Sequence, residues 1–283
     1  MQTSGPAAGG PGIDSCDEPP VYPSVETANE RPAIRFEPRA PADWLPAACD
    51  GVTENLALDE ALLEEAHEGL VEHAVVRTWM ADEPTVVLGS SSRAEDEVDL
   101  ESCRRLGVRV LRRPSGGLTV VLGPGCLMWT VVVHQPAGPA PIEVIHGAIL
   151  DPLVAALRTA GAPVTRLGSS DLAIGPGPAA RKVSGNALRV RRHGVLYHGT
   201  LLDAFDLDVI GRVLRHPHRE PAYRAGRSHG AFLANLGLGR PVLEAAVRAA
   251  FCATRDRDGH PVERVARLVR ERYENPAWIS RRD

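Results

Sequence analysis

The chain contains 283 residues, of which 43% are hydrophobic and 24% are charged, as in a globular protein of one large or two modest domains. The formal net charge is −4 (32 basic against 36 acidic residues), so no global basic field favours nucleic acid or an anionic membrane as a partner. The sequence also lacks an apolar run of about 18 residues that could span a bilayer, and we expect a cytoplasmic protein.

The N-terminal half of the chain combines short strands with two helices. Residues 1–31 are rich in Pro, Gly and Ser without apolar periodicity, which predicts a disordered tail before a folded region at 32–283. Apolar spacing and turn residues then predict, in chain order, a strand at 33–36, a helix at 53–70, strands at 74–80 and 85–88, a short helix at 99–106, and strands at 108–112, 119–122 and 127–133.

The C-terminal half continues with a long helix, a group of strands and two further helices. The same patterns predict a helix at 142–160, strands at 171–174, 182–190, 195–198 and 200–203, and helices at 240–253 and 262–273. The turn GPGPAA favours a hairpin between the first two of these strands, and Gly199 interrupts the last pair. Strands joined mostly by short turns, with few helices, predict an α+β layered fold.

The numbers and positions of lysine and cysteine in the chain point to candidate functional residues. Of the 32 basic residues, 31 are arginine and only Lys182 is lysine. A compact ammonium can do chemistry that a planar guanidinium cannot, so Lys182 is a candidate for function, although compositional drift would also leave a single survivor. The five cysteines are scattered without a CxxC pair, so we expect neither a disulfide framework nor a metal site.

Three segments combine glycine with polar residues. RRPSGG (112–117) would present backbone N–H groups, a charge and a hydroxyl to an anion, but the same segment also fits a hairpin turn that needs positive φ. RKVSGNAL (181–188) places Lys182 after a glycine-rich turn, and YHGTLL (197–202) is a strand where a ligand can approach Gly199 closely. Together they supply an anion cradle, a point charge and a polar lining.

RRPSGG, RKVSGNA and HGTLL, in this order, resemble the motifs of the lipoate–protein ligase family within the biotin/lipoate ligase superfamily. NLALDE (55–60), TVVLG (85–89) and GSSDL (168–172) support the resemblance, which runs from about residue 50 to the end. It implies a mixed, largely antiparallel sheet with packed helices, as in the catalytic domains of biotin ligases and class II synthetases, within one catalytic domain at 32–283.

The resemblance implies a two-step reaction. The carboxylate of lipoate or octanoate attacks the α-phosphate of ATP, which brings Mg²⁺, and an acceptor lysine then attacks the acyl-adenylate. Lys182 would be catalytic, bridging carboxylate and α-phosphate. The residues expected to bind ATP are Arg113, Ser115, Gly116, Gly117, Leu118, Thr119, Val120, Val121 and Lys182. Those expected to bind the acyl group are Asp171, Lys182, Ser184, Gly185, His198, Gly199 and Thr200.

The implied partners are lipoyl domains of 2-oxoacid dehydrogenase complexes or the glycine cleavage H protein. The sequence departs from the family pattern at three places. Leu118 stands where the family has a third glycine, Leu122-Gly123 where it has a His-Asp pair, and Cys126 where it has an asparagine. The C-terminal accessory domain of the long ligases is not found after the last helix, so we expect either that adenylation or acceptor transfer needs a separate accessory protein or that the activity has drifted.

Two rival functions remain open. The first is an octanoyltransferase that takes the acyl group from acyl carrier protein through a cysteine nucleophile, but residues 164–181, where one branch carries it, contain no cysteine. Cys126 is the substitute, and its alternative interpretation is a small buried residue at the start of a strand. The second is a non-catalytic lipoyl- or lipoate-binding homologue, favoured by the missing His-Asp pair and disfavoured by Lys182. Biotin ligation fits the motifs less well.

Overall fold

A six-stranded mixed sheet organises the computed structural model, which describes residues 41–46 and 49–281, all within the unit Ile34–Asp283. The strand order is β10-β11-β6-β2-β1-β12; neighbours are antiparallel from β10 to β2 and parallel from β2 to β12. The bounds are β1 Asp43–Leu45, β2 Val75–Met80, β6 Cys126–His134, β10 Asn186–Arg191, β11 Gly194–Leu202 and β12 Arg255–Asp256. The tail predicted at 1–31 and the strand predicted at 33–36 lie outside the described residues.

Two three-stranded sheets flank the main sheet. One has the order β4-β3-β5, formed by β3 (Thr85–Leu88), β4 (Arg109–Arg112) and β5 (Val120–Leu122). The other is antiparallel with the order β7-β8-β9, formed by β7 (Thr165–Leu167), β8 (Asp171–Ile174) and β9 (Arg181–Ser184). Only one pair in these two sheets, β3 with β4, is parallel, so antiparallel pairing predominates.

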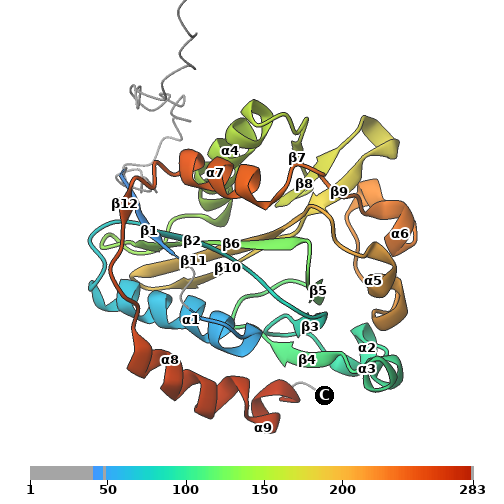
Figure 1. The fold of residues 1–283 in the computed structure, drawn as a ribbon, viewed down its shortest axis with the longest axis horizontal. Coiled ribbons are helices and arrows are strands. Elements are labelled where there is room, and N and C mark those ends of the chain that lie inside the picture. Colours follow the sequence, from blue (N-terminus) through green and yellow to red (C-terminus); the bar gives the residue numbers. More distant parts are fainter. Residues whose placement is uncertain (1–40, 47–48, 282–283) are drawn as a thin grey trace, which may run out of the picture. The chain divides into compact units, whose positions relative to one another are not determined.

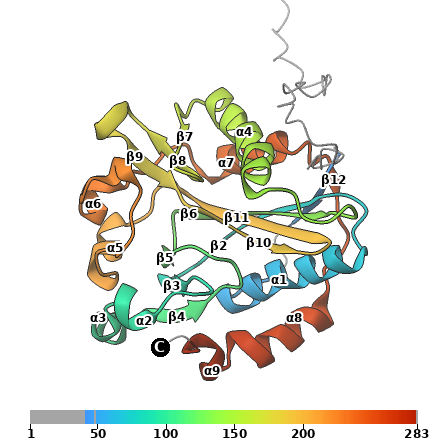
Figure 2. The ribbon, with the colours of Figure 1, turned by 180° about the vertical axis from the view of Figure 1, so that it is seen from behind.

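Helices cover both faces of the main sheet, with α1 and α8 on one side and α4 and α7 on the other (Figures 1 and 2). No helix in the described part of the chain is long and apolar enough to cross a membrane. The α-helices are α1 Val52–Glu68, α2 Ala94–Glu97, α3 Leu100–Leu106, α4 Ile142–Thr159, α5 Leu207–Val213, α6 His229–Phe232, α7 Arg240–Ala250, α8 Val262–Leu268 and α9 Pro276–Ile279. Short turns of helix are η1 Gly177–Ala179, η2 Ala222–Arg224 and the π-helical η3 Val269–Tyr273.

The central strand β6 is buried on both faces because helices cover both sides of the sheet. Alternate residues separate into two cores. Leu127, Trp129 and Val131 pack on the side of α4 and α7, whereas Met128 and Val132 pack on the side of α1. The continuous apolar run in the sequence therefore reflects a strand between two layers.

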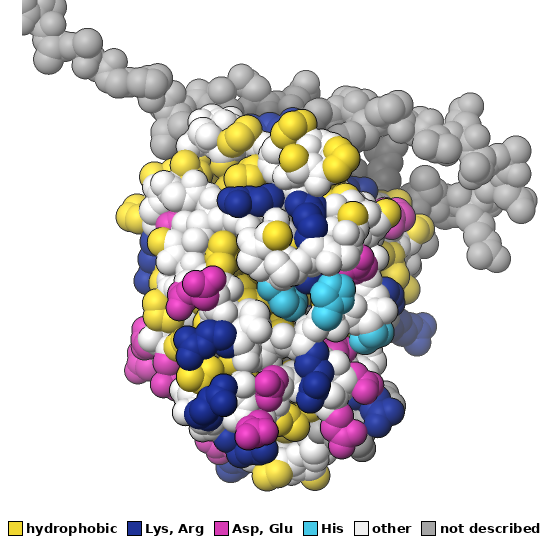
Figure 3. Space-filling view, turned by 90° about the vertical axis from the view of Figure 1, so that its right-hand side faces the viewer, with side chains coloured by type: hydrophobic (Ala, Val, Ile, Leu, Met, Phe, Trp, Pro, Cys, Tyr) yellow, Lys and Arg dark blue, Asp and Glu magenta, His cyan; other side chains and the backbone are white. Residues whose placement is uncertain are grey.

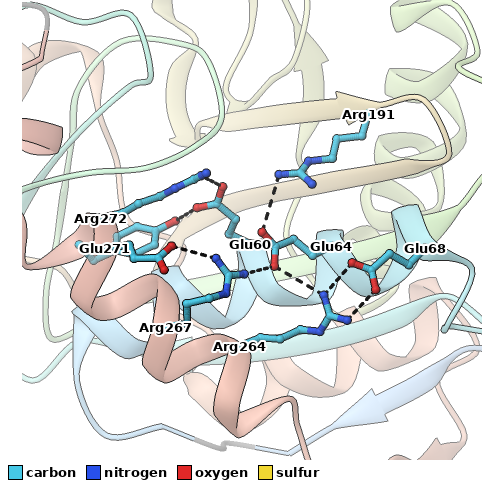
Figure 4. A network of polar contacts seen from close by, with 9 residues as sticks. Glu60, Glu64, Glu68, Arg191, Arg264, Arg267, Glu271 and Arg272 are labelled. Atoms are coloured by element: carbon cyan, nitrogen blue, oxygen red, sulfur yellow. Dashed lines mark hydrogen bonds and ion pairs between the residues drawn. The ribbon is translucent and has the colours of Figure 1, made fainter.

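Ion pairs attach the C-terminal helices to α1 (Figure 4). Glu60, Glu64 and Glu68 follow one another at one-turn intervals along α1 and pair with Arg272, Arg267 and Arg264 respectively. Tyr273 also donates a hydrogen bond to the Glu60 carboxylate at 2.8 Å. The inner end of this network is buried and the outer end is exposed, so its members contribute unequally to stability.

Most predicted elements are confirmed within a residue or two. Asp99 caps α3 through the Ser102 N–H, and Gly107 ends that helix in the left-handed conformation, as its sequence indicates. The strand predicted at 182–190 is wrong, because Gly185 divides it between β9 and β10, which belong to different sheets. The interruption predicted at Gly199 is also wrong, because β11 pairs continuously with β6 through that residue.

The network predicts an unequal response to loss of a carboxylate. Glu60→Ala removes the acceptor of both Arg272 and Tyr273 at a side chain that is 3% exposed, so we expect a loss of about 2 to 3 kcal/mol of unfolding free energy. The matched control Glu68→Ala acts at a side chain that is 46% exposed and should cost at most about 1 kcal/mol. Urea unfolding of both variants measures the difference, and equal losses would contradict this account.

Candidate functional site

A cavity of about 560 Å³ opens where the main sheet, α1 and the two flanking sheets meet. All three sequence motifs contribute to its wall, through Gly117, Lys182 and His198 among others, as do residues 219–222. On the face shown in Figure 3, over α5 and α6, basic and acidic side chains are intermixed. The motifs that are far apart in the sequence therefore line one site.

Lys182 and Asp171 form an ion pair in the cavity wall. The Lys182 Nζ lies 2.8 Å from Asp171 Oδ1, and the second carboxylate oxygen accepts a hydrogen bond from the Tyr223 hydroxyl at 3.0 Å. Burial, reinforced by the Asp171 charge and hydrogen bond, raises the pKa of Tyr223, so this hydroxyl stays protonated and donates. The side chains of Lys182 and Asp171 are 26% and 15% exposed, so both can contact a ligand in the cavity.

Two glycines leave space for these polar side chains. A Cβ at Gly185 would lie 3.0 Å from both Cε and Nζ of Lys182. A Cβ at Gly199 would lie 1.7 Å from Asn186 Oδ1 and 2.9 Å from Trp129 Nε1. Neither position tolerates a side chain without movement of its neighbours, which gives these motif glycines a physical role.

Arg113 shapes the loop that connects β4 and β5. Its guanidinium donates to the Ser115 hydroxyl at 3.0 Å and to the carbonyl oxygens of Val87, Gly116 and Leu118 at 3.1, 2.6 and 2.9 Å. Burial lowers the pKa of Arg113 to about 10, so it remains charged at neutral pH. Because these donors are directed to the protein itself, Arg113 supports the loop that lines the cavity.

Asp59 is the centre of a buried polar network beneath the cavity. Its carboxylate accepts from Arg77 at 2.8 Å, from the Thr130 hydroxyl at 3.0 Å and from His198 Nδ1 at 3.0 Å. His198 Nε2 lies 2.6 Å from the Ser115 hydroxyl. Burial opposes ionisation, but His198 and Arg77 together lower the pKa of Asp59, so the carboxylate is charged.

The ionised Asp59 fixes the direction of the hydrogen bonds that follow it. A charged carboxylate requires a proton on His198 Nδ1, and in the neutral imidazole Nε2 then accepts from Ser115. Asp59 was not among the predicted site residues. The sequence does contain a signal for Asp59. This acidic residue lies three residues after Leu56 and four before Leu63, and therefore on the apolar face of a helix.

Apolar side chains form another part of the cavity wall. Trp79 and Met128 are cross-strand partners on the α1 side of the sheet, and Leu56, Val87 and Leu122 line the same cavity. The wall thus combines a lysine-containing polar region with an apolar region. This combination accommodates a ligand with a charged end and a hydrocarbon body.

Not every predicted site residue reaches the cavity. Those in its wall are Arg113, Gly117, Leu118, Thr119, Val120, Asp171, Lys182, Gly185, His198, Gly199 and Thr200. Ser115, Val121 and Ser184 are buried behind it, and Gly116 is half-buried outside the lining set. Asn186 also lines the cavity and was not among the predicted site residues, although it lies within the motif RKVSGNAL. Trp79, Arg219 and Tyr223 were missed because only the tertiary fold brings them to the site.

The described cysteines do not supply a nucleophile for this cavity. Cys49, Cys103, Cys126 and Cys252 are all absent from its wall. Cys126 is completely buried, and burial raises the pKa of its thiol to about 12. Within residues 41–46 and 49–281, no group of three or more His, Cys, Asp or Glu side chains is arranged to hold a metal ion.

Comparison with known proteins identifies the family. Residues 52–254 match the model of the lipoyl protein ligase A/B catalytic domain. The chain belongs to this family. A candidate lipoate-protein ligase A of Aeropyrum pernix is 32% identical over 56% of this chain and 57% of its own length, so this chain spans little more than half of that relative. The octanoyltransferase LipM of Symbiobacterium thermophilum is 30% identical over 71% of this chain and 80% of its own.

Solved structures of lipoate ligases share the fold. The bipartite lipoate protein ligase of Thermoplasma acidophilum superimposes with a TM-score of 0.72 at 22% identity, over 84% of this chain and 96% of that one. A lipoate-protein ligase A bound with ATP gives 0.69 at 23% identity, over 86% and 99%. The predicted biotin/lipoate ligase fold is confirmed. The chain is an enzyme of the lipoate ligase and octanoyltransferase family.

The geometry around Lys182 predicts the effect of adding one methyl group. Gly185→Ala places a Cβ 3.0 Å from Cε and Nζ of Lys182, so the flexible end of this side chain must shift by a few tenths of an ångström relative to Asp171. We expect activity to fall by up to about tenfold, because catalysis depends on the precise placement of such groups. The matched control Gly211→Ala, on α5 with open space around it, should keep wild-type activity. Acyl transfer to a lipoyl domain measures both variants, and unchanged turnover in Gly185→Ala would contradict this role of the glycine.

Proposed function

We propose that this enzyme activates lipoate or octanoate with ATP and transfers the acyl group to a lysine of a lipoyl domain. The observation that supports this proposal most strongly is the position of Lys182, the single lysine of the chain. Its ammonium lies in the wall of a cavity that is polar in one region and apolar in another. A carboxylic acid with a long hydrocarbon body matches this wall. The resemblance in the motifs and the match to the ligase catalytic domain both support the proposal.

Lys182 has a defined task in the proposed first step. The acid's carboxylate and the α-phosphate are both anionic and repel each other as they approach. An ammonium between them offsets this repulsion, and Lys182 can reach them from the cavity wall by a movement of its flexible stem away from Asp171. The loop 113–118, with Thr119 and Val120, would hold the nucleotide, and Mg²⁺ would accompany the phosphates of ATP.

Trp79, Met128 and Leu122 would enclose the hydrocarbon body of the acid. Burial of such a chain in an apolar region contributes about 0.8 kcal/mol for each methylene group. His198 and Thr200 would lie beside the acyl group, as the motif HGTLL implies. The proposal includes either lipoate or octanoate, since both have an eight-carbon acid backbone.

Lipoyl domains are the proposed acceptors. The solved Thermoplasma acidophilum system pairs a bipartite lipoate protein ligase with its E2 lipoyl domain, which supports this class of partner. That ligase is bipartite, which also supports the proposal that a separate protein completes the activity. The H protein of glycine cleavage remains an expected acceptor from the motif resemblance.

Octanoyl transfer without ATP is the second candidate, because several relatives of this chain are named octanoyltransferase LipM. The cysteines argue against a thioester route, since none of those described lines the cavity and Cys126 is both buried and poorly ionised. A role limited to binding is less consistent with the lysine–aspartate pair in the wall.

The first test is acid-dependent exchange of pyrophosphate into ATP. Wild-type protein with lipoate or octanoate should exchange, and Lys182→Ala should lose about 10²- to 10³-fold in rate, as when one preorganised donor is removed. Lys182→Arg should not restore the rate, because a planar fork does not replace a point charge. Absence of exchange in wild type would contradict the ligase proposal, and near-normal exchange in either variant would remove Lys182 from the mechanism.

Cys126 supplies a separate test of the transferase route. Cys126→Ser should retain transfer activity, because the thiol is outside the cavity wall and its pKa is far above neutral. Intact-mass analysis of wild type incubated with octanoyl carrier protein should show no acyl adduct. Loss of transfer in this variant, together with an adduct on wild type, would establish a cysteine-dependent octanoyltransferase.

A further inference from the structure

The Asp171 carboxylate divides its two oxygens between two donors. Lys182 on the neighbouring strand β9 occupies Oδ1 at 2.8 Å, and Tyr223 in η2 donates to Oδ2 at 3.0 Å. Asp171 itself is the first residue of β8 and lines the cavity. Its orientation is therefore fixed from one side by Tyr223, while among the described residues its other oxygen is paired with Lys182, which the proposed reaction needs elsewhere.

The other carboxylates of the described cavity wall have different partners. Asp59 is completely buried among Arg77, Thr130 and His198. Glu220 accepts from the backbone N–H of Gly226 at 2.7 Å and pairs with Arg224 at 3.4 Å. Asp171 is thus the carboxylate of this wall that lies directly beside the lysine proposed to hold the reacting groups.

Formation of an acyl-adenylate changes the surroundings of Asp171. In the proposed function, the Lys182 ammonium is drawn toward the acid's carboxylate and the α-phosphate. Asp171 Oδ1 then loses its cationic partner while Tyr223 still holds Oδ2. The result is a partly desolvated carboxylate adjacent to the mixed anhydride, at the stage when a second lysine, from the acceptor, must enter as an amine.

We propose that Asp171 is the general base of the acyl-transfer step and Tyr223 its positioning residue. The acceptor Nζ forms a bond to the acyl carbon, and the bond between that carbon and the phosphate oxygen breaks. AMP leaves with the electron pair, and the proton lost from nitrogen goes to Asp171 Oδ1. This inference rests on the proposed function, because it requires an acyl-adenylate, and it assigns the acid–base work of its second step.

The proposed base predicts that the two half-reactions respond differently to Asp171→Asn. Asparagine keeps the size of the side chain and an oxygen for Lys182, but it cannot take a proton. Transfer from synthetic lipoyl-AMP to a purified E2 lipoyl domain should fall by about 10²- to 10⁴-fold, as for loss of a general base. Pyrophosphate exchange should fall much less. Asp151→Asn, an exposed carboxylate on α4, is the matched control and should affect neither.

Chemical rescue distinguishes a base from a structural support. Asp171→Ala leaves a space next to Lys182 in which formate can replace the carboxylate, so added formate should restore transfer from lipoyl-AMP in proportion to its concentration. Tyr223→Phe should lower the rate of transfer with little change in the KM for the lipoyl domain, because only the orientation of the base is loosened.

The outcomes separate this inference from the proposed function. Wild type that exchanges no pyrophosphate contradicts the ligase proposal, whereas the transfer assay begins from synthetic adenylate and does not depend on exchange. Equal losses of exchange and transfer in Asp171→Asn, or no rescue of Asp171→Ala by formate, would show that Asp171 only positions Lys182 and would overturn the inference.

Discussion

The ionised carboxylate of Asp59 is the constraint on which the site depends. A buried charge is tolerated only when fixed donors replace water, and here the donors come from β2, β6 and β11 through Arg77, Thr130 and His198. One helix is thereby tied to three neighbouring strands. Through His198 the same charge sets the hydrogen bond to Ser115 and so the position of the loop between β4 and β5. One buried charge thus connects α1, three strands and the loop between β4 and β5.

The chain passes from one sheet to another at Gly185, in the wall of the cavity. Residues on either side of this glycine pair with β8 in one sheet and with β11 in another, so the two sheets diverge at this point. Lys182 lies just before the divergence and extends into the space, where the absence of a Cβ at Gly185 leaves room for its ammonium. The glycine thus has both a topological and a chemical role.

The sequence predicted those helices and strands whose ends and pattern depend on residues close together in the chain. The cap at Asp99, the stop at Gly107 and the continuous apolar strand β6 all follow from neighbours in the chain. The division at Gly185 did not, because the residues on either side of this glycine do not indicate which sheet each half will join. Among site residues, the glycine motifs and Lys182 were predictable from resemblance. Tyr223 was not, since it enters the site through a hydrogen bond across 52 residues of sequence from a segment without a distinctive pattern.

The unusual basic composition fits the different tasks of the two cations. Arg77 and Arg113 are buried, and their planar forks satisfy several fixed oxygens at once, which suits residues that hold elements in place. Such a multiply bonded fork cannot exchange partners without breaking the structure that it supports. Lys182 pairs through one compact ammonium on a flexible stem, next to a carboxylate that a second residue orients. In the proposed reaction, the group that passes from Asp171 to the phosphate has to leave one anion for another, and the single lysine of a chain with 31 arginines suits this task better than a guanidinium would.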